Sequence, residues 1–157
     1  MPFPWLLAAG VAMQIFGSSK EAKAQKEAGQ YNAKIYRMNA SIKRKMAQDS
    51  LKRGDTAEAW HRMDVADVKA DQRARMLAGG QTITGSNSRI LDDTAFFGEL
   101  DALTIRQNAA REAWGHETEA KNYGMQAELA EKGGQSAANA TIITGAAQAA
   151  GTWYSNA

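Results

Sequence analysis

The chain has 157 residues, a formal net charge of +2 and no cysteine, which excludes a disulfide framework and thiolate chemistry. Hydrophobic residues make up 44% of it, but 31 residues are alanine and only 23 are Leu, Ile, Val or Phe. So few large apolar side chains make a compact core hard to build. We therefore expect an all-α protein whose long helices bury small faces against sister copies, as an obligate homo-oligomer.

Charged residues are confined to the middle of the chain. Every Lys, Arg, Asp and Glu lies between Lys20 and Lys132, whereas the ends of soluble domains normally lie in water. This pattern predicts three segments: an apolar N-terminal helix over 1–19, a charged long-helix hairpin over 20–132 and an uncharged C-terminal helix over 133–157. Uncharged ends are typical of a protein that contacts membrane or other subunits.

The first predicted helix spans Pro4–Phe16, with proline in the first turn, where its missing N–H matters least. Its roughly 12 apolar residues reach only ~18 Å, well short of the ~30 Å hydrocarbon core of a bilayer. We expect this helix to lie in the membrane interface or against another subunit. The residues expected to contact membrane here are Trp5, Leu6, Leu7, Val11, Ile15 and Phe16.

Helical periodicity continues over Lys20–Ala78, where apolar residues recur at spacings of three and four. One stripe is large and consists of Tyr31, Ile35, Met38, Ile42 and Met46. A second, mostly small stripe consists of Ala59, Met63, Ala66, Ala70, Ala74 and Leu77. Gly54, followed by Asp55 and Thr56, marks a possible break with an N-cap. A kinked and a continuous helix both stay open.

The stretch Gly79–Ser88 has the Gly, Ser, Thr and Asn content of a turn and is expected to reverse one helix onto the next. A phosphate-binding loop is disfavoured because no Gly-Lys-Ser/Thr follows and no strand precedes it. Asp92, Asp93 and Thr94 then supply an N-cap and favourable negative charge for a helix over Thr94–Lys132.

This third helix carries a predicted core-facing stripe of Phe96, Leu100, Leu103, Ala110, Ala113, Ala120 and Ala127. Trp114 flanks the stripe, and Arg106 and Arg111 are expected to reach acidic groups or a neighbouring subunit. Gly133 and Gly134 are expected to end the helix. The residues expected to pack between subunits are Phe96, Leu100, Leu103, Arg106, Ala110, Arg111 and Trp114.

A last helix is predicted over Ser136–Trp153. Its candidate membrane-contacting residues are Ile142, Ile143, Trp153 and Tyr154, and the two aromatic residues suit a membrane interface. An alanine-rich helix packed inside an oligomer explains the same pattern equally well, so both interpretations stay open.

Charge is graded along the middle of the chain. Residues 20–53 hold ten basic and three acidic residues, a net charge of +7, whereas residues 80–132 hold five basic and nine acidic residues, a net charge of −4. The basic stretch, with Tyr31 and Tyr36, could contact DNA or anionic lipid. Pairing with the acidic helix of the same or a neighbouring chain is the favoured interpretation.

No catalytic constellation is present, so we expect no enzyme, no cofactor and no metal. His61 and His116 stand alone and are interpreted as solvated. Glu99 and Asp101 are two residues apart on a helix and point to different sides, which makes a poor acid–base pair. No nucleophile elbow, metal-ligand spacing or nucleotide fingerprint occurs.

Residues Leu91–Gly115 (LDDTAFFGELDALTIRQNAAREAWG) resemble the central signature of the small internal virion proteins, also called core or ejection proteins, of short-tailed bacteriophages. The preceding Gln72–Gly80 and the closing Gly145–Gln148 with Trp153-Tyr154 also fit, and the resemblance covers about residues 71–154. It is weakest over residues 20–53.

The resemblance implies a protein packed in the capsid near the portal, beside the portal and other core proteins. It also implies release into the host envelope at infection, where the protein would help form a DNA-delivery channel. The main alternative is a purely structural head–tail or portal-associated ring protein that stays in the virion. A holin-type lysis protein is disfavoured because its apolar spans are usually longer, and a muralytic enzyme because no paired acidic site is present.

Overall fold

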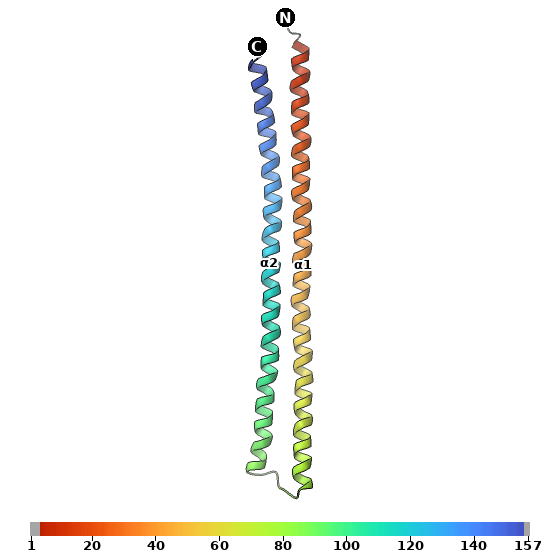
Figure 1. Cartoon of the computed structure of the whole chain (residues 1–157), viewed down its shortest axis with the longest axis vertical. Helices are drawn as coiled ribbons and strands as arrows, with labels where there is room; N and C mark the ends of the chain where they lie inside the picture. The colour runs from red at the N-terminus through yellow and green to blue at the C-terminus, as the bar shows by residue number, and fades with distance from the viewer. Residues whose placement is uncertain (1–3, 156–157) are drawn as a thin grey trace. The chain divides into compact units, whose positions relative to one another are not determined.

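In the computed structural model of the chain, the described residues 4–155 form two helices joined by one loop (Figure 1). Helix α1 spans Pro4–Ala78 and helix α2 spans Ser86–Ser155. Side chains are described for residues 16–151. No strand occurs within 4–155, so the prediction of an all-α fold is confirmed.

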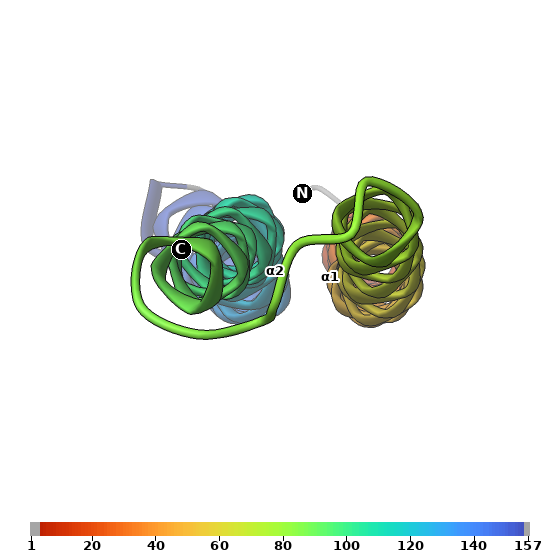
Figure 2. The same cartoon turned by 90° about the horizontal axis from the view of Figure 1, so that it is seen from below.

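The interhelical contacts group into two units. Unit 1 consists of Met1–Ser41 and Ala120–Ala157, and unit 2 of Ile42–Glu119. Within each unit a segment of α1 lies antiparallel to a segment of α2. In unit 2 the loop after Ala78 connects the two segments (Figure 2), so unit 2 is a helical hairpin.

The loop begins with a standard helix C-cap. The Gly80 N–H donates to the Leu77 carbonyl at 3.0 Å and the Gln81 N–H donates to the Met76 carbonyl at 2.9 Å, which together form a Schellman motif. Gly80 has a φ of 71°, a left-handed conformation that glycine adopts without strain. The expected reversal is therefore confirmed, although the loop is shorter than predicted because α2 already begins at Ser86.

The interface between the helices is built from the smallest side chains. Among the described side chains, every buried hydrophobic residue except Leu91 is alanine, and the largest side chain with less than 2% exposure is that of Ser50. Burial of an alanine contributes much less than burial of a leucine, because the gain scales with apolar area. The buried alanines are Ala22, Ala33, Ala40, Ala47, Ala102, Ala109, Ala113, Ala120, Ala127, Ala138 and Ala149.

This interface corrects part of the predicted stripes. Ala113, Ala120 and Ala127 are buried as expected, but Phe96, Leu100, Leu103 and Ala110 are exposed and face away from the partner segment. All six members of the small stripe from Ala59 to Leu77 are exposed as well. Helical periodicity identifies a face but not its partner, and here the alanine face, not the bulky one, meets the second helix.

The predicted helix end at Gly133 and Gly134 is wrong, because both lie inside α2. At Gly54, where a break was left open, α1 is one continuous helix. Two of these three glycines mark close approach. A Cβ added at Gly134 would lie 2.8 Å from the Gly29 Cα, and one added at Gly54 would collide with the Ala109 side chain. Packing of the two helices therefore outweighs the weak helix preference of glycine.

Two further boundaries are corrected. The predicted gap between Phe16 and Lys20 is absent, because α1 runs through it without interruption. Asp92, Asp93 and Thr94 lie inside α2 rather than at its start. The Thr94 hydroxyl accordingly donates to the Ile90 carbonyl one turn earlier, at 2.9 Å. Leu91, which precedes Asp92 and Asp93, is only 8% exposed. Its burial favours a helix that begins before the two aspartates.

The neighbouring glycines 133 and 134 allow a matched test of this interface. Gly134→Ala should lower the free energy of unfolding by about 1–3 kcal/mol, because its methyl group meets backbone atoms of Gly29. Gly133→Ala should raise it by about 0.5–1 kcal/mol, because nothing lies within 4 Å and alanine favours the helix. Thermal melts followed by circular dichroism measure both, and equal effects of the two substitutions would contradict the close approach.

Candidate self-association and envelope-contact surfaces

Most of the large apolar side chains described for residues 16–151 lie on the outside of the two helices. Trp114 is 70% exposed, Ile143 69%, Tyr31 67% and Trp60 62%. Scattered single apolar residues on a surface are normal, but many of them on two helices indicate surfaces that are covered by a partner. The molecule is thus inverted relative to a globular domain, with small residues inside and large ones outside.

The residues expected to pack between subunits all lie in unit 2 and all are exposed. Phe96 and Phe97 form an edge-to-face aromatic pair with ring centroids 5.6 Å apart. Arg106 and Arg111 form no ion pair within the described part of the chain. None of the seven is used by the hairpin interface, and their contact with a neighbouring subunit stays a prediction.

The residues expected to contact membrane are only partly described. Phe16, Ile142 and Ile143 are exposed, by 71%, 51% and 69% of their surfaces. The side chains of Trp5, Leu6, Leu7, Val11, Ile15, Trp153 and Tyr154 lie outside the described residues. Along the part of the chain that is described, no helical stretch is both long and apolar enough to cross a bilayer.

Ion pairs connect the two helices, and in each the basic residue comes from α1 and the acidic residue from α2. In unit 1, Arg37 pairs with Glu131. The three pairs of unit 2 are Lys43 with Glu119, Arg53 with Glu112 at 2.8 Å, and Arg62 with Glu99 at 2.6 Å. The favoured interpretation of the charge gradient, pairing of the basic helix with the acidic one, is confirmed within the chain.

Arg62 is the centre of a three-residue network. Its guanidinium donates to both carboxylate oxygens of Glu99, at 2.6 and 3.2 Å, and also pairs with Glu58 at 2.9 Å. The hydrogen bond from Arg62 lowers the pKa of Glu99, and that from Lys43 lowers the pKa of Glu119. Glu58 is only 7% exposed at its side chain, so Arg62 supplies the charge that a buried carboxylate requires.

The aromatic residues of the basic stretch differ in their surroundings. Tyr36 stacks on Tyr123 of α2, with ring centroids 6.4 Å apart and planes inclined by 26°. Tyr31 is 67% exposed. Of the two tyrosines considered for DNA or lipid contact, only Tyr31 therefore has its ring largely open to a partner.

A groove runs between the helices of unit 2. It has a volume of about 320 Å³ and is bordered by Leu51 of α1 and Trp114 of α2, with Arg44 and Glu117 at its polar edges. Small residues, including Ala47 and Ala113, also line it. An apolar side chain from another helix fits such a site by size and chemistry.

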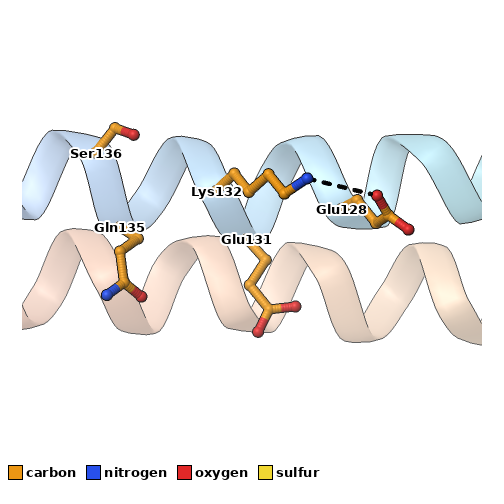
Figure 3. A pocket seen from close by; sticks show the side chains of 5 residues that line it. All are labelled: Glu128, Glu131, Lys132, Gln135 and Ser136. Atoms are coloured by element: carbon orange, nitrogen blue, oxygen red, sulfur yellow. Dashed lines mark ion pairs between the residues drawn. The ribbon is translucent and has the colours of Figure 1, made fainter.

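A second hollow, of about 470 Å³, lies on α2 in unit 1 (Figure 3). Lys132 and Glu128 at its edge form an ion pair at 3.7 Å. It is lined by Glu128, Glu131, Lys132, Gln135 and Ser136. No histidine and no activated nucleophile borders it, so the hollow offers no evident catalytic chemistry.

The two histidines do not behave alike. The Nε2 atom of His61 is buried without a hydrogen-bond partner, so the interpretation of His61 as solvated is wrong. His116 lies 3.9 Å from Glu112 and its side chain is 24% exposed. Both belong to the helix interface, and no cluster of three potential metal ligands occurs among the described residues.

The sequence contained a signal for this interface that the stripe of large residues obscured. Ala33, Ala40, Ala47 and Gly54 follow one another at intervals of seven residues, and so do Ala113, Ala120, Ala127 and Gly134. A seven-residue repeat of core positions is the pattern of two helices wound around each other. The interhelical ion pairs could not be found in the same way, because they depend on the register of the two helices.

One family matches the chain over nearly its whole length. The family model described as T7 virus internal virion protein gp14 matches residues 3–157, which include both helices and the loop. The resemblance found over about residues 71–154 is thus confirmed and extends over the basic N-terminal half. No curated protein and no solved structure matches the chain significantly.

The lowered pKa values of Glu99 and Glu119 predict acid sensitivity of the hairpin. Both lie below the ordinary value of 4.5, so the folded state favours the charged form. Their contribution to stability is full above pH 4.5 and is lost as the pH falls through the lowered values. The melting temperature should therefore fall below pH 4.5, and Glu99→Gln with Glu119→Gln should reduce that fall.

Glu128→Gln is the control, because Glu128 pairs only with Lys132 of its own helix and its loss leaves the interhelical pairs intact. If the double variant keeps the full acid-dependent fall in melting temperature, the two interhelical pairs are not its cause.

Proposed function

The chain belongs to the T7 virus internal virion protein gp14 family and is an internal virion protein, and we propose that it is packed near the portal and leaves the particle at infection. In the host envelope it helps to form the channel through which DNA enters the cell. Its partners are sister copies, the portal and other core proteins in the virion, and host membrane after ejection.

The main support for this proposal is the placement of large apolar residues on the outside. The hairpin interface takes up alanine and glycine and leaves Phe16, Ile142 and Ile143 open to the surroundings. Such side chains associate with sister subunits while the protein is stored and are equally suited to lipid afterwards. A protein that contacts other subunits first and lipid later requires apolar side chains that are not buried in its own fold.

The thin interface is the second support. Passage through a narrow tail requires helices that separate easily. An interface of alanine residues buries little apolar area, and exposed ion pairs contribute little each. Helices, moreover, satisfy their own backbone hydrogen bonds in lipid, so the separated segments can enter an envelope without an unpaired backbone.

Ile142→Lys combined with Ile143→Lys tests the membrane role. Both side chains are more than half exposed, so the helix pair tolerates the change, but each lysine costs about 3 kcal/mol at the centre of a bilayer. Virions carrying the double variant should assemble and adsorb normally, and delivery of DNA should fall by at least an order of magnitude. Uptake of labelled phage DNA by host cells measures this.

Met125→Lys is the matched control, because Met125 is 58% exposed on α2 in the same unit but lies within the charged part of the chain. Its virions should deliver DNA normally. Purified wild-type protein should also release dye from lipid vesicles, and the double variant should not. Normal delivery of DNA by the double variant would contradict the membrane role. It would favour the alternative of a structural ring protein that stays in the virion.

A further inference from the structure

Two ion pairs define two opposite sides of the hairpin in unit 2. Arg53 and Arg62 are nine residues apart on α1, so at about 100° per residue they project from opposite sides of the helix. Each nevertheless reaches α2, Arg53 through Glu112 and Arg62 through Glu99. One pair therefore crosses the interface on one side of the hairpin and the other pair on the opposite side. We call them the Arg53 side and the Arg62 side.

The Arg53 side carries three large apolar residues of α1. Ile42, Met46 and Trp60 lie eleven residues before, seven before and seven after Arg53, and each interval is close to a whole number of turns. All three therefore project in nearly the same direction as Arg53. They are exposed by 48%, 43% and 62%, so a large part of this line of side chains stays uncovered in the hairpin.

The Arg62 side carries large apolar residues of α2. Phe96, Leu103 and Trp114 project within about 60° of Glu99, given their separations along the helix. The groove bordered by Leu51 and Trp114 opens on the same side, because Leu51 lies eleven residues before Arg62. The hairpin thus presents a ridge of apolar side chains on one side and an apolar groove on the other.

The charges of the two sides differ as well. On the Arg53 side, the charged residues that form no ion pair within unit 2 are all acidic: Asp49, Asp64, Asp67 and Asp101. On the Arg62 side they are four basic residues, Arg44, Lys69, Arg73 and Arg106, and three acidic ones, Asp55, Asp92 and Glu117. The unpaired charge is therefore −4 on one side and +1 on the other.

We propose that sister copies associate through unlike sides, so that the Arg53 side of one hairpin packs on the Arg62 side of the next. Ile42, Met46 and Trp60 then meet the groove beside Trp114, and the acidic residues of one copy meet Arg44, Lys69 and Arg73 of its neighbour. Contact between two Arg53 sides would instead bring two sets of uncompensated aspartates together. Like-charge contacts of this kind disfavour a wrong partner.

An interface between unlike surfaces has a consequence for assembly. Each copy keeps one free side of each kind after it binds a neighbour, so association continues until a ring closes or a filament grows. This inference rests on the proposed function in one respect, namely that sister copies are the partners. It adds which two faces of unit 2 are in contact.

Charge reversal tests the pairing of unlike sides. The test does not depend on knowing how far one copy is shifted along its neighbour. One variant carries Asp64→Lys and Asp67→Lys and the other carries Lys69→Glu and Arg73→Glu. Each variant by itself should associate at least tenfold more weakly than the wild-type full chain, because its two sides no longer carry opposite charge. An equimolar mixture should recover association, because each variant then offers the charge that the other lacks. Sedimentation velocity measures the assembly, and circular dichroism checks that both variants remain helical.

The apolar contact is tested by Trp60→Ala against Met63→Ala. The two residues are similarly exposed, by 62% and 58%, but Met63 points away from both sides of the hairpin. Trp60→Ala should weaken association about tenfold or more, as is typical of a tryptophan at the centre of an interface. Met63→Ala should change it by less than about twofold.

Three results would overturn the proposal: a wild-type chain that stays monomeric, a mixture no more associated than its components, or equal effects at Trp60 and Met63. Because the aspartate variant keeps its Arg62 side, it should still bind the Arg53 side of the wild type, and failure to join wild-type assemblies would also overturn the proposal. These measurements are made in buffer and need no ejection. A failure of channel formation therefore leaves them unaffected, and their failure leaves the vesicle test unaffected.

Discussion

The close approach of two alanine-lined helices is the constraint on which the rest of the structure depends. At Gly29 and Gly134 the two backbones come so near that an added methyl group would meet main-chain atoms 2.8 Å away. Only alanine, glycine and serine fit along most of such a contact. Large side chains are consequently displaced to the outer surfaces of both helices, where Trp114 and Ile143 stay about 70% exposed.

The charges follow from the same pairing. In unit 2 the basic residues of α1 meet acidic residues of α2 in reverse order along the chain, from Lys43 with Glu119 to Arg62 with Glu99. Each exposed pair contributes little energy. A small-residue interface is smooth, however, and a shift of one helix along the other would separate several of these pairs together. The ordered series therefore specifies the register that alanine packing alone defines only weakly.

The inverted distribution of side chains leaves much apolar surface of this internal virion protein outside its own fold. The proposed contacts with sister subunits and with the host envelope would use that surface. In unit 2 the ridge near Trp60 and the groove near Trp114 lie on opposite sides, as the proposed association of one hairpin with two neighbours requires.

Periodicity along the chain was sufficient to identify the helical class and the turn near Gly80, because helix formation is local and α-helical spacing is visible in any window of a few turns. It nevertheless divided two helices into four. The resemblance over Leu91–Gly115 was sufficient to identify the family. The large stripe of Tyr31 and Met38 was also found, but whether it faced the second helix was not decided by its spacing, since periodicity defines a face and not what covers it.

Only the tertiary structure decided which face is inside. It places Ala33 and Ala120 in the interface and Phe96 outside it, and it carries the helices through Gly54, Gly133 and Gly134, where local preference predicts a break. The physical reason is that helix ends and buried faces depend on a partner many residues away. A glycine weakens an isolated helix, but beside another backbone it is the residue that allows the two helices to meet.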